Sequence, residues 1–285
     1  MDKIVTVALA IVALPVASLF AATRYVVPAG TDGNTPTAPY TSLATAANDI
    51  PSALDAAEPN DTVLILPGTY SMTQRYILTK EQHLGITIRS YDPDKGGAIN
   101  SEDTIIDGSG VEAGAAAWNG TNGVFFARLN SSTSPGFTFD GLTFKNARGG
   151  AIKAMYTTGA QILNCNFLSN TNNYSGGAVC LYGTNKDIVS NCLFSANRAL
   201  GGTFYGGGLY HHIWGDKVEN SPRVIKCTFV GNESYHGGGV GLSSHASVSN
   251  CTFNGNYSQS GVGARFTWPP KESSWAVSSL VPSMA

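Results

Sequence analysis

The sequence predicts an all-β solenoid, a single-stranded parallel β-helix with a capping helix at its N-terminal end. Glycine pairs and short alternating runs rich in β-branched residues fill the second half of the chain and leave no room for pairs of helices. One short phrase recurs there five times, with phenylalanines spaced by 23, 27, 35 and 24 residues at Phe144, Phe167, Phe194, Phe229 and Phe253. A repeat of this length is typical of a solenoid.

Each repeat is expected to form one coil of β-structure. Runs such as 161–165 and 223–227 have the length of a strand. At roughly 3.3 Å per strand residue, about 24 residues make three short strands and three bends, which is the circumference of one rung of a parallel β-helix. Neighbouring rungs should then pair in parallel and stack like residue on like residue.

The recurring residues have structural roles in such a fold. The Phe and Cys positions alternate with polar residues, so they should point together into the core. The Asn position should lie at a bend in the left-handed conformation, and its amide can bond to the rungs on either side. The glycine pairs mark a second bend, where a Cβ atom would clash. The asparagines are Asn170, Asn197, Asn232 and Asn256, and the first copy departs from the pattern with Phe144-x-Asn146.

Four of the five cysteines occupy one inward position of the repeat: Cys165, Cys192, Cys227 and Cys251. An exported chain with five cysteines could form disulfides, and neighbouring rungs about 4.8 Å apart would permit a bridge. We favour buried free thiols, because Cys packs in such a column as a small hydrophobic residue. No His or carboxylate accompanies the column, so we predict no metal site there.

At this point the chain resembles known proteins. The Gly-Gly-Ala-Ile and Phe-x-x-Asn signatures resemble the repeats of polymorphic outer membrane proteins, and the wider pattern is similar to the pectin-lyase-like superfamily of right-handed β-helices. The resemblance covers about residues 137–263 and extends more weakly to the opening segment 25–70. It implies a right-handed coil that acts either in surface adhesion or as a polysaccharide lyase or hydrolase.

The first part of the chain predicts export and a cap. Residues 1–22 combine Lys3, an apolar stretch over 4–14 and small residues near Ala21 and Ala22, as in a secretory signal peptide; the alternative is a membrane anchor. Apolar residues at helical spacing over 41–57 predict a helix that begins at Thr41 or Ser42 and covers the first coil. The later runs 63–66, 86–89, 104–106, 124–127 and 137–139 can supply the early coils.

Composition and acidic residues argue against several functions. With a net charge of −2 and 13% charged residues, neither nucleic acid nor an anionic membrane is an obvious partner. Lyases of the resembled superfamily use Lys or Arg with clustered carboxylates for calcium, yet the acidic residues of 123–263 are few and do not line up. Lys145, Arg148 and Lys153 are the best candidate bases, and we expect them to be solvated surface residues. We therefore predict no catalytic residue and no cofactor.

One region predicts a binding site. In the strands after the glycine pairs, Lys153 with Met155, Cys180 with Tyr182, Tyr210 with His212 and Gly241 with Ser243 should share an outward face. Tyr182, Tyr210 and His212 would stack across two rungs, next to a long insertion that carries Trp214. Such an aromatic shelf could hold a sugar ring. These four residues are the predicted ligand-binding set; ordinary surface aromatics are the alternative.

The sequence thus predicts a signal peptide at 1–22, a β-helix domain at 23–263 and an off-pattern tail at 264–285 that forms no rung. We expect an exported, extracellular or cell-surface protein. Its predicted role is adhesion or surface display, with an extracellular polysaccharide or a cell-surface glycan as partner. A polysaccharide lyase or hydrolase and a structural spacer of the envelope are the alternatives.

Overall fold

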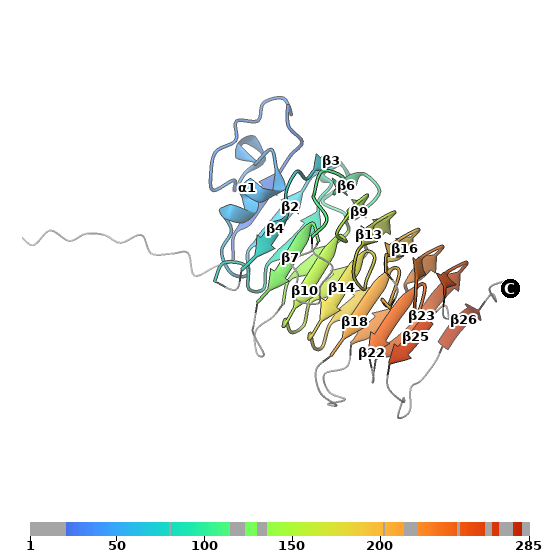
Figure 1. Cartoon of the computed structure of the whole chain (residues 1–285). Helices are drawn as coiled ribbons and strands as arrows, with labels where there is room; N and C mark the ends of the chain where they lie inside the picture. Colours follow the sequence, from blue (N-terminus) through green and yellow to red (C-terminus); the bar gives the residue numbers. More distant parts are fainter. Residues whose placement is uncertain are drawn as a thin grey trace, which may run out of the picture.

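The chain folds into an elongated stack of β-coils with a small cap at its N-terminal end (Figure 1). The computed structural model describes residues 21–79, 81–114, 123–129, 136–201, 203–213, 222–242 and 246–259, together with the main chain of 243, 264–267 and 276–280. Residues 1–20 of the predicted signal peptide and Trp214 lie outside the described residues.

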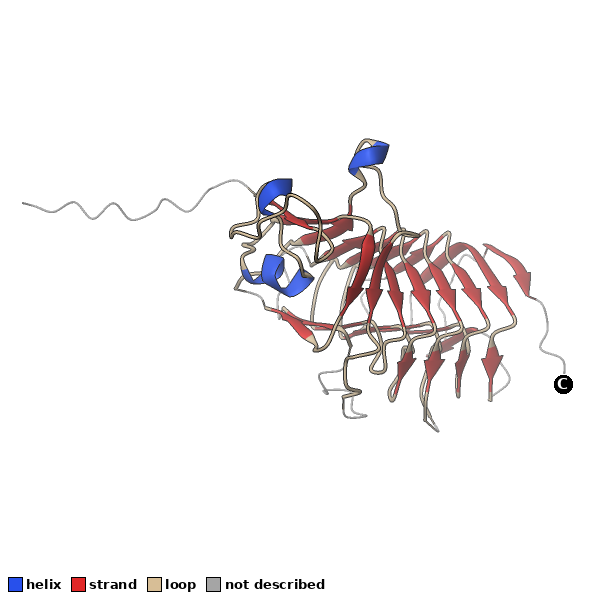
Figure 2. Cartoon of the chain, turned by 90° about the horizontal axis from the view of Figure 1, so that it is seen from above, coloured by secondary structure: helices blue, strands red, loops and turns tan. Residues whose placement is uncertain are grey.

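Three parallel sheets run along the stack in the described part of the chain (Figure 2). The first half of the long sheet contains β1 (Thr23–Val26), β2 (Thr62–Ile65), β5 (Thr87–Ser90), β8 (Thr138–Asp140), β11 (Gln161–Leu163), β15 (Ile188–Ser190), β19 (Arg223–Ile225) and β23 (Ser247–Asn254). The second half, joined through β23, contains β20 (Thr228–Val230), β16 (Leu193–Ser195), β12 (Asn166–Leu168), β9 (Thr143–Lys145), β6 (Thr104–Asp107) and β3 (Gly68–Ser71).

The other two sheets close the coil. The seven-stranded sheet contains β4 (Tyr76–Leu78), β7 (Phe125–Arg128), β10 (Ile152–Met155), β14 (Val179–Tyr182), β18 (Leu209–His212), β22 (Val240–Ser243) and β25 (Ala264–Thr267). The four-stranded sheet contains β13 (Thr171–Asn172), β17 (Arg198–Ala199), β21 (Glu233–Ser234) and β24 (Tyr257–Ser258). The predicted early coils are confirmed, since each of their runs forms a strand.

The phenylalanine column is the centre of the core, as predicted. Phe144, Phe167, Phe194, Phe229 and Phe253 pair in register and are 0–6% exposed. Their rings are stacked nearly parallel, with successive centroids 5.2, 4.8, 4.8 and 4.9 Å apart. Burial of these rings is the main favourable contribution to stacking one rung on the next.

The asparagine ladder is also confirmed, with one correction. The Nδ2 group of Asn197 donates to Oδ1 of Asn232 at 2.9 Å and to the Phe167 carbonyl at 2.9 Å. The left-handed residue of this bend, however, precedes each ladder asparagine, as Ser169 (φ 54°) and Ala196 (φ 55°) show. The ladder asparagines therefore stabilise the bend through their side chains. Their own backbone does not adopt the left-handed conformation.

This correction explains the odd first copy of the repeat. Asn146 has φ 58° and occupies the left-handed position. Ala147 takes the ladder position, where its N–H donates to Oδ1 of Asn170 at 3.0 Å. The asparagine of the first copy therefore occupies the left-handed position of the bend, a conformation that Asn tolerates.

The cysteines are all buried free thiols, as we favoured. In the inward column, Sγ of Cys192 lies 3.4 Å from the Ile162 carbonyl and Sγ of Cys227 lies 3.5 Å from the Val189 carbonyl of the preceding rung. The glycine pairs form a second bend, as expected. A Cβ atom on Gly177 would overlap the carbonyl oxygen of Gly207 in the next rung.

The predicted cap helix over 41–57 is wrong in its extent. The structure has a 3-10 turn, η1 (Leu43–Thr45), and a separate short helix, α1 (Ile50–Asp55), whose N-cap is Asp49 and not Thr41 or Ser42. Between them Ala47 pairs with β1, donating to Tyr25 O at 2.9 Å, so its main chain completes the edge of the first strand instead of continuing a helix. α1 still covers the end of the core with Ile50, Ala53 and Leu54.

The expected end of the coil at residue 263 is also too early. β25 pairs in register with β22, from Val240 opposite Ala264 to Ser243 opposite Thr267. β26 (Ala276–Leu280) pairs with β23 with shifts in register. Sequence periodicity missed these strands because neither copies the repeated phrase. Among the described helices, none combines the length and the apolar character needed to cross a membrane.

Candidate functional site

The candidate site lies on the outward face of the seven-stranded sheet. Side chains there form two rows, because parallel register places like positions above one another. The inner row contains Phe126, Lys153, Cys180, Tyr210 and Gly241. The outer row contains Arg128, Met155, Tyr182 and His212, and it runs along the axis of the coil.

The outer row brings together two residues of the predicted binding set, Tyr182 and His212. Tyr182 and His212 are half-buried and stacked, with centroids 4.9 Å apart and an interplanar angle of 11°. Their facing surfaces cover each other along the axis. Farther along, the Arg128 guanidinium lies 5.4 Å from the centroid of the half-buried Tyr156 ring.

Tyr210 is not part of an exposed shelf. It lies in the inner row opposite Cys180, is 7% exposed and stacks on Tyr205 at 5.8 Å. Tyr205 in turn stacks on His236 at 4.8 Å. Aromatic residues of the segments that lead into β18 and β22 therefore cover the inner row at Tyr210. Alternation of side chains could place Tyr210 on the outward face but could not show that these segments fold over it.

Lys153 is likewise covered, which corrects its expected place on the solvated surface. Only 1% of it is exposed, and its Nζ lies 5.3 Å from the centroid of the Tyr174 ring. Burial lowers the pKa of Lys153, Cys180 offsets part of this effect, and the charge of Arg75 lowers the pKa further. A base in this position does not face a polymer at the surface.

In the described part of the chain, the other candidate bases and acids are far apart or paired with each other. Lys145 forms an ion pair with Asp107 at 3.7 Å, and Arg148 is exposed. Arg198 pairs with Glu233 at 2.9 Å. Among the described residues no group of three or more metal-binding side chains converges.

Two residues of the outer row, Tyr182 and His212, are uncharged at neutral pH. Burial lowers the pKa of His212, and the neighbouring His211 lowers it further, so the imidazole of His212 is neutral at neutral pH. Burial raises the pKa of Tyr182, so the phenol keeps its proton. A neutral imidazole and a phenol can each donate and accept hydrogen bonds.

Behind the outer row, a buried polar cluster was missed by sequence reasoning. On β18 the chain alternates, so His211 points inward while His212 points outward. His211 Nε2 lies 2.8 Å from Asp187 Oδ2 and 3.1 Å from Thr184 Oγ1, and all three residues are at most 1% exposed. Asp187 also accepts the Ala160 N–H at 2.8 Å. The adjacent pair His211-His212 was the available signal, but nothing in the sequence indicated that Asp187 would lie opposite.

The polar cluster fixes the strand that carries His212. His211 and His212 are consecutive residues of β18. The contact between His211 and Asp187 therefore also fixes the position of the outward-pointing His212 ring. Because the Thr184 and Asp187 side chains come from the preceding coil, the cluster joins the rung of Tyr182 to the rung of His212.

The comparisons agree with this architecture. The sequence model of the family described as "Right handed beta helix region" matches residues 115–267, which is more than half of the chain. This range includes the outer row and the polar cluster. No curated protein and no solved structure matches the chain. The parallel register of the sheets and this family match together show that the chain belongs to the right-handed β-helix family.

Proposed function

We propose that the protein is an exported β-helix repeat protein that acts in adhesion or surface display by binding carbohydrate along the outer row. The observation that carries this proposal is the in-register row of Arg128, Met155, Tyr182 and His212, in which Arg128, Tyr182 and His212 carry polar groups and Met155 is buried between them. The apolar stretch over 4–14 supports export.

Sugar hydroxyls suit the chemistry of this row. A hydroxyl both donates and accepts, and so does the phenol of Tyr182, whereas the neutral imidazole of His212 can offer only Nε2, because its Nδ1 is buried. The guanidinium of Arg128 adds donors at the other end of the row. The aromatic bodies supply apolar contact beside these polar groups, which is the mixture that carbohydrate sites need.

The row also suits a linear ligand. Successive rungs are about 4.8 Å apart, so the four residues from Arg128 to His212 span roughly 15 Å along the axis. A chain of sugars laid along the coil would meet Arg128 at one end and Tyr182 and His212 at the other, and would pass over the buried Met155 between them.

Binding can be tested with the full chain on a glycan array, followed by titration of the strongest neutral hits. We expect Tyr182→Ala and His212→Ala each to weaken binding by about tenfold, a loss of one to two hydrogen bonds and a ring contact. The matched control is Tyr257→Ala, because Tyr257 is 55% exposed on the four-stranded sheet, away from the row. Equal affinity in all three variants would refute the proposed site.

The alternative classes predict different results in the same experiments. A lyase or hydrolase would depolymerise a uronate polymer. A structural spacer of the envelope would neither bind nor cleave any glycan. Binding without turnover that depends on Tyr182 is the result that separates the proposed function from both.

A further inference from the structure

The N-terminal end of the coil contains an open strand edge. β3 is the terminal strand of the long sheet and pairs only with β6 in the described part of the chain. The N–H groups of Gly68 and Met72 donate to β6 and its flanks, at 2.7 Å to Asp103 O and 2.9 Å to Asp107 O. Main-chain groups alternate between the two edges of a strand, so those of Thr69 and Ser71 point away from β6. Within the described ranges no hydrogen bond reaches the main-chain groups of these two residues.

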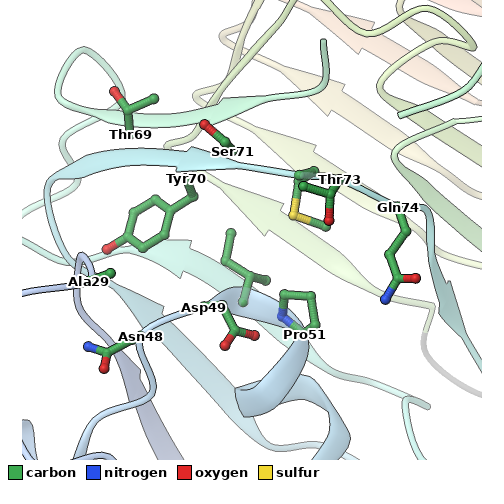
Figure 3. A pocket seen from close by; sticks show the side chains of 11 residues that line it. Ala29, Asn48, Asp49, Pro51, Thr69, Tyr70, Ser71, Thr73 and Gln74 are labelled. Atoms are coloured by element: carbon green, nitrogen blue, oxygen red, sulfur yellow. The ribbon is translucent and has the colours of Figure 1, made fainter. Parts of the chain in front are cut away.

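A pocket of about 430 Å³ lies beside this edge. Thr69 and Ser71 line it from β3, and Asn48, Asp49 and Pro51 line it from the start of α1 (Figure 3). Figure 3 shows the side chains of Thr69 and Ser71 on the side of β3 away from Asp49. Because Thr69 and Ser71 still line the pocket, their unpaired main-chain groups border it, and its volume is large enough for a ligand.

The pocket is negatively charged. Asp49 is the only charged residue among those that line it. Its carboxylate accepts Ser52 N at 2.7 Å and Ser52 Oγ at 2.8 Å as the N-cap of α1, yet the residue remains exposed. Gln74 adds a polar side chain at the end of β3, and Ile50 and Met72 are buried beneath.

We propose that this edge binds an extended peptide that carries a basic side chain. The peptide would add a strand to β3 by bonding to the free main-chain groups of Thr69 and Ser71, and its Lys or Arg would lie in the pocket next to Asp49. Strand addition supplies affinity through main-chain hydrogen bonds, and a side-chain pocket supplies selectivity. The four residues of β3 match a peptide of about five residues.

The test uses the full chain and a fluorescent acetyl-Thr-Val-Lys-Val-Thr-amide peptide, followed by anisotropy. Ser71→Pro removes the outward N–H at an edge position that tolerates proline, and we expect binding to weaken about tenfold or more. Ser71→Ala is the matched control, because it keeps the main chain and should bind like the natural protein. Thermal unfolding of both variants checks that the fold persists.

Charge is tested separately. A peptide with Glu in place of Lys should bind about fivefold more weakly, and Asp49→Asn should remove this preference while preserving the N-cap. Equal binding by the Ser71→Pro and Ser71→Ala variants, or no binding of either peptide to the natural protein, would overturn the proposal. Self-association of the natural protein that Ser71→Pro abolishes would also overturn it, because a second copy would then occupy the edge.

Discussion

The asparagine ladder shows how one side chain holds neighbouring rungs together. The side chain of Asn232 donates to Phe194 O and to Asn256 Oδ1, and its own Oδ1 accepts from the main chain and the amide of Asn197. All four bonds connect different rungs at a buried position. The core phenylalanines supply the hydrophobic energy, whereas the asparagines satisfy main-chain groups at the bend that would otherwise be buried without partners.

Replacing Asn232 with Ala should lower the free energy of unfolding by about 3 kcal/mol, because it leaves several buried donors and acceptors without partners. Denaturant titration measures this change. Asn254→Ala is the control, since Asn254 is exposed at the end of β23, and its effect should stay within about 0.5 kcal/mol. A small effect of Asn232→Ala would mean that the ladder does not stabilise the fold.

Two histidines make stability depend on pH. Burial is the main cause of the lowered pKa of both His83 and His212. Between the ordinary pKa of 6.5 and the lower pKa of the folded protein, the unfolded chain binds more protons. Stability should therefore be fully present above this window and decrease as the pH falls through it.

Denaturant unfolding between pH 8 and about 5.5 measures this slope. In His83→Gln the slope should become smaller, because the contribution of His83 in that window is lost. An unchanged slope would show that His83 is not responsible for the pH dependence.

At the scale of elements, sequence reasoning was most successful where the repeat is regular. Phe, Cys and Asn of the repeated phrase could be assigned correctly to columns, since parallel stacking places like residues together. The cap was less predictable, because Ala47 is used to pair with β1 although its spacing suits a helix. The strands β25 and β26 were missed because they lack the phrase.

Only the regular part of the candidate site, the alternation of side chains along the strands, could be predicted from the sequence. Alternation placed Tyr182 and His212 on one outward face, and they stack there. Burial of Tyr210 and Lys153 depends on the segments of Tyr174 and Tyr205 folding over the inner row, which no local pattern encodes. The Asp187–His211 pair depends on contacts between residues 24 positions apart.

The buried cysteines, four in the column and Cys180 on β14, should be unreactive in the folded protein. Burial raises the pKa of Cys165 to about 12 and that of Cys180 to about 11, and the pKa values of Cys227 and Cys251 are also raised. Because the thiolate is the reactive form, native protein should resist iodoacetamide near pH 8. Mass spectrometry should find no labelled cysteine before unfolding and five after it. Rapid labelling of the native protein would contradict the buried column.

On the scale of the whole molecule, the regular coil places the side chains of the outer row at the same position in successive rungs. The Phe, Cys and Asn residues of the repeated phrase are used almost entirely for the core and its bends. The half-buried and exposed members of the outer row, Arg128, Tyr182 and His212, lie outside these core columns. A ligand aligned with the axis would use several rungs, whereas a compact ligand would use one.

The most direct test of this account is titration calorimetry with a length series of the neutral linear oligosaccharide that binds best on the array. If the ligand runs along the outer row, affinity should increase with each added sugar until the chain spans the roughly 15 Å from Arg128 to His212, and then stay constant. In Tyr182→Ala the increase should stop earlier. Affinity that does not change with length, or cleavage of the oligosaccharide during the titration, would contradict the account.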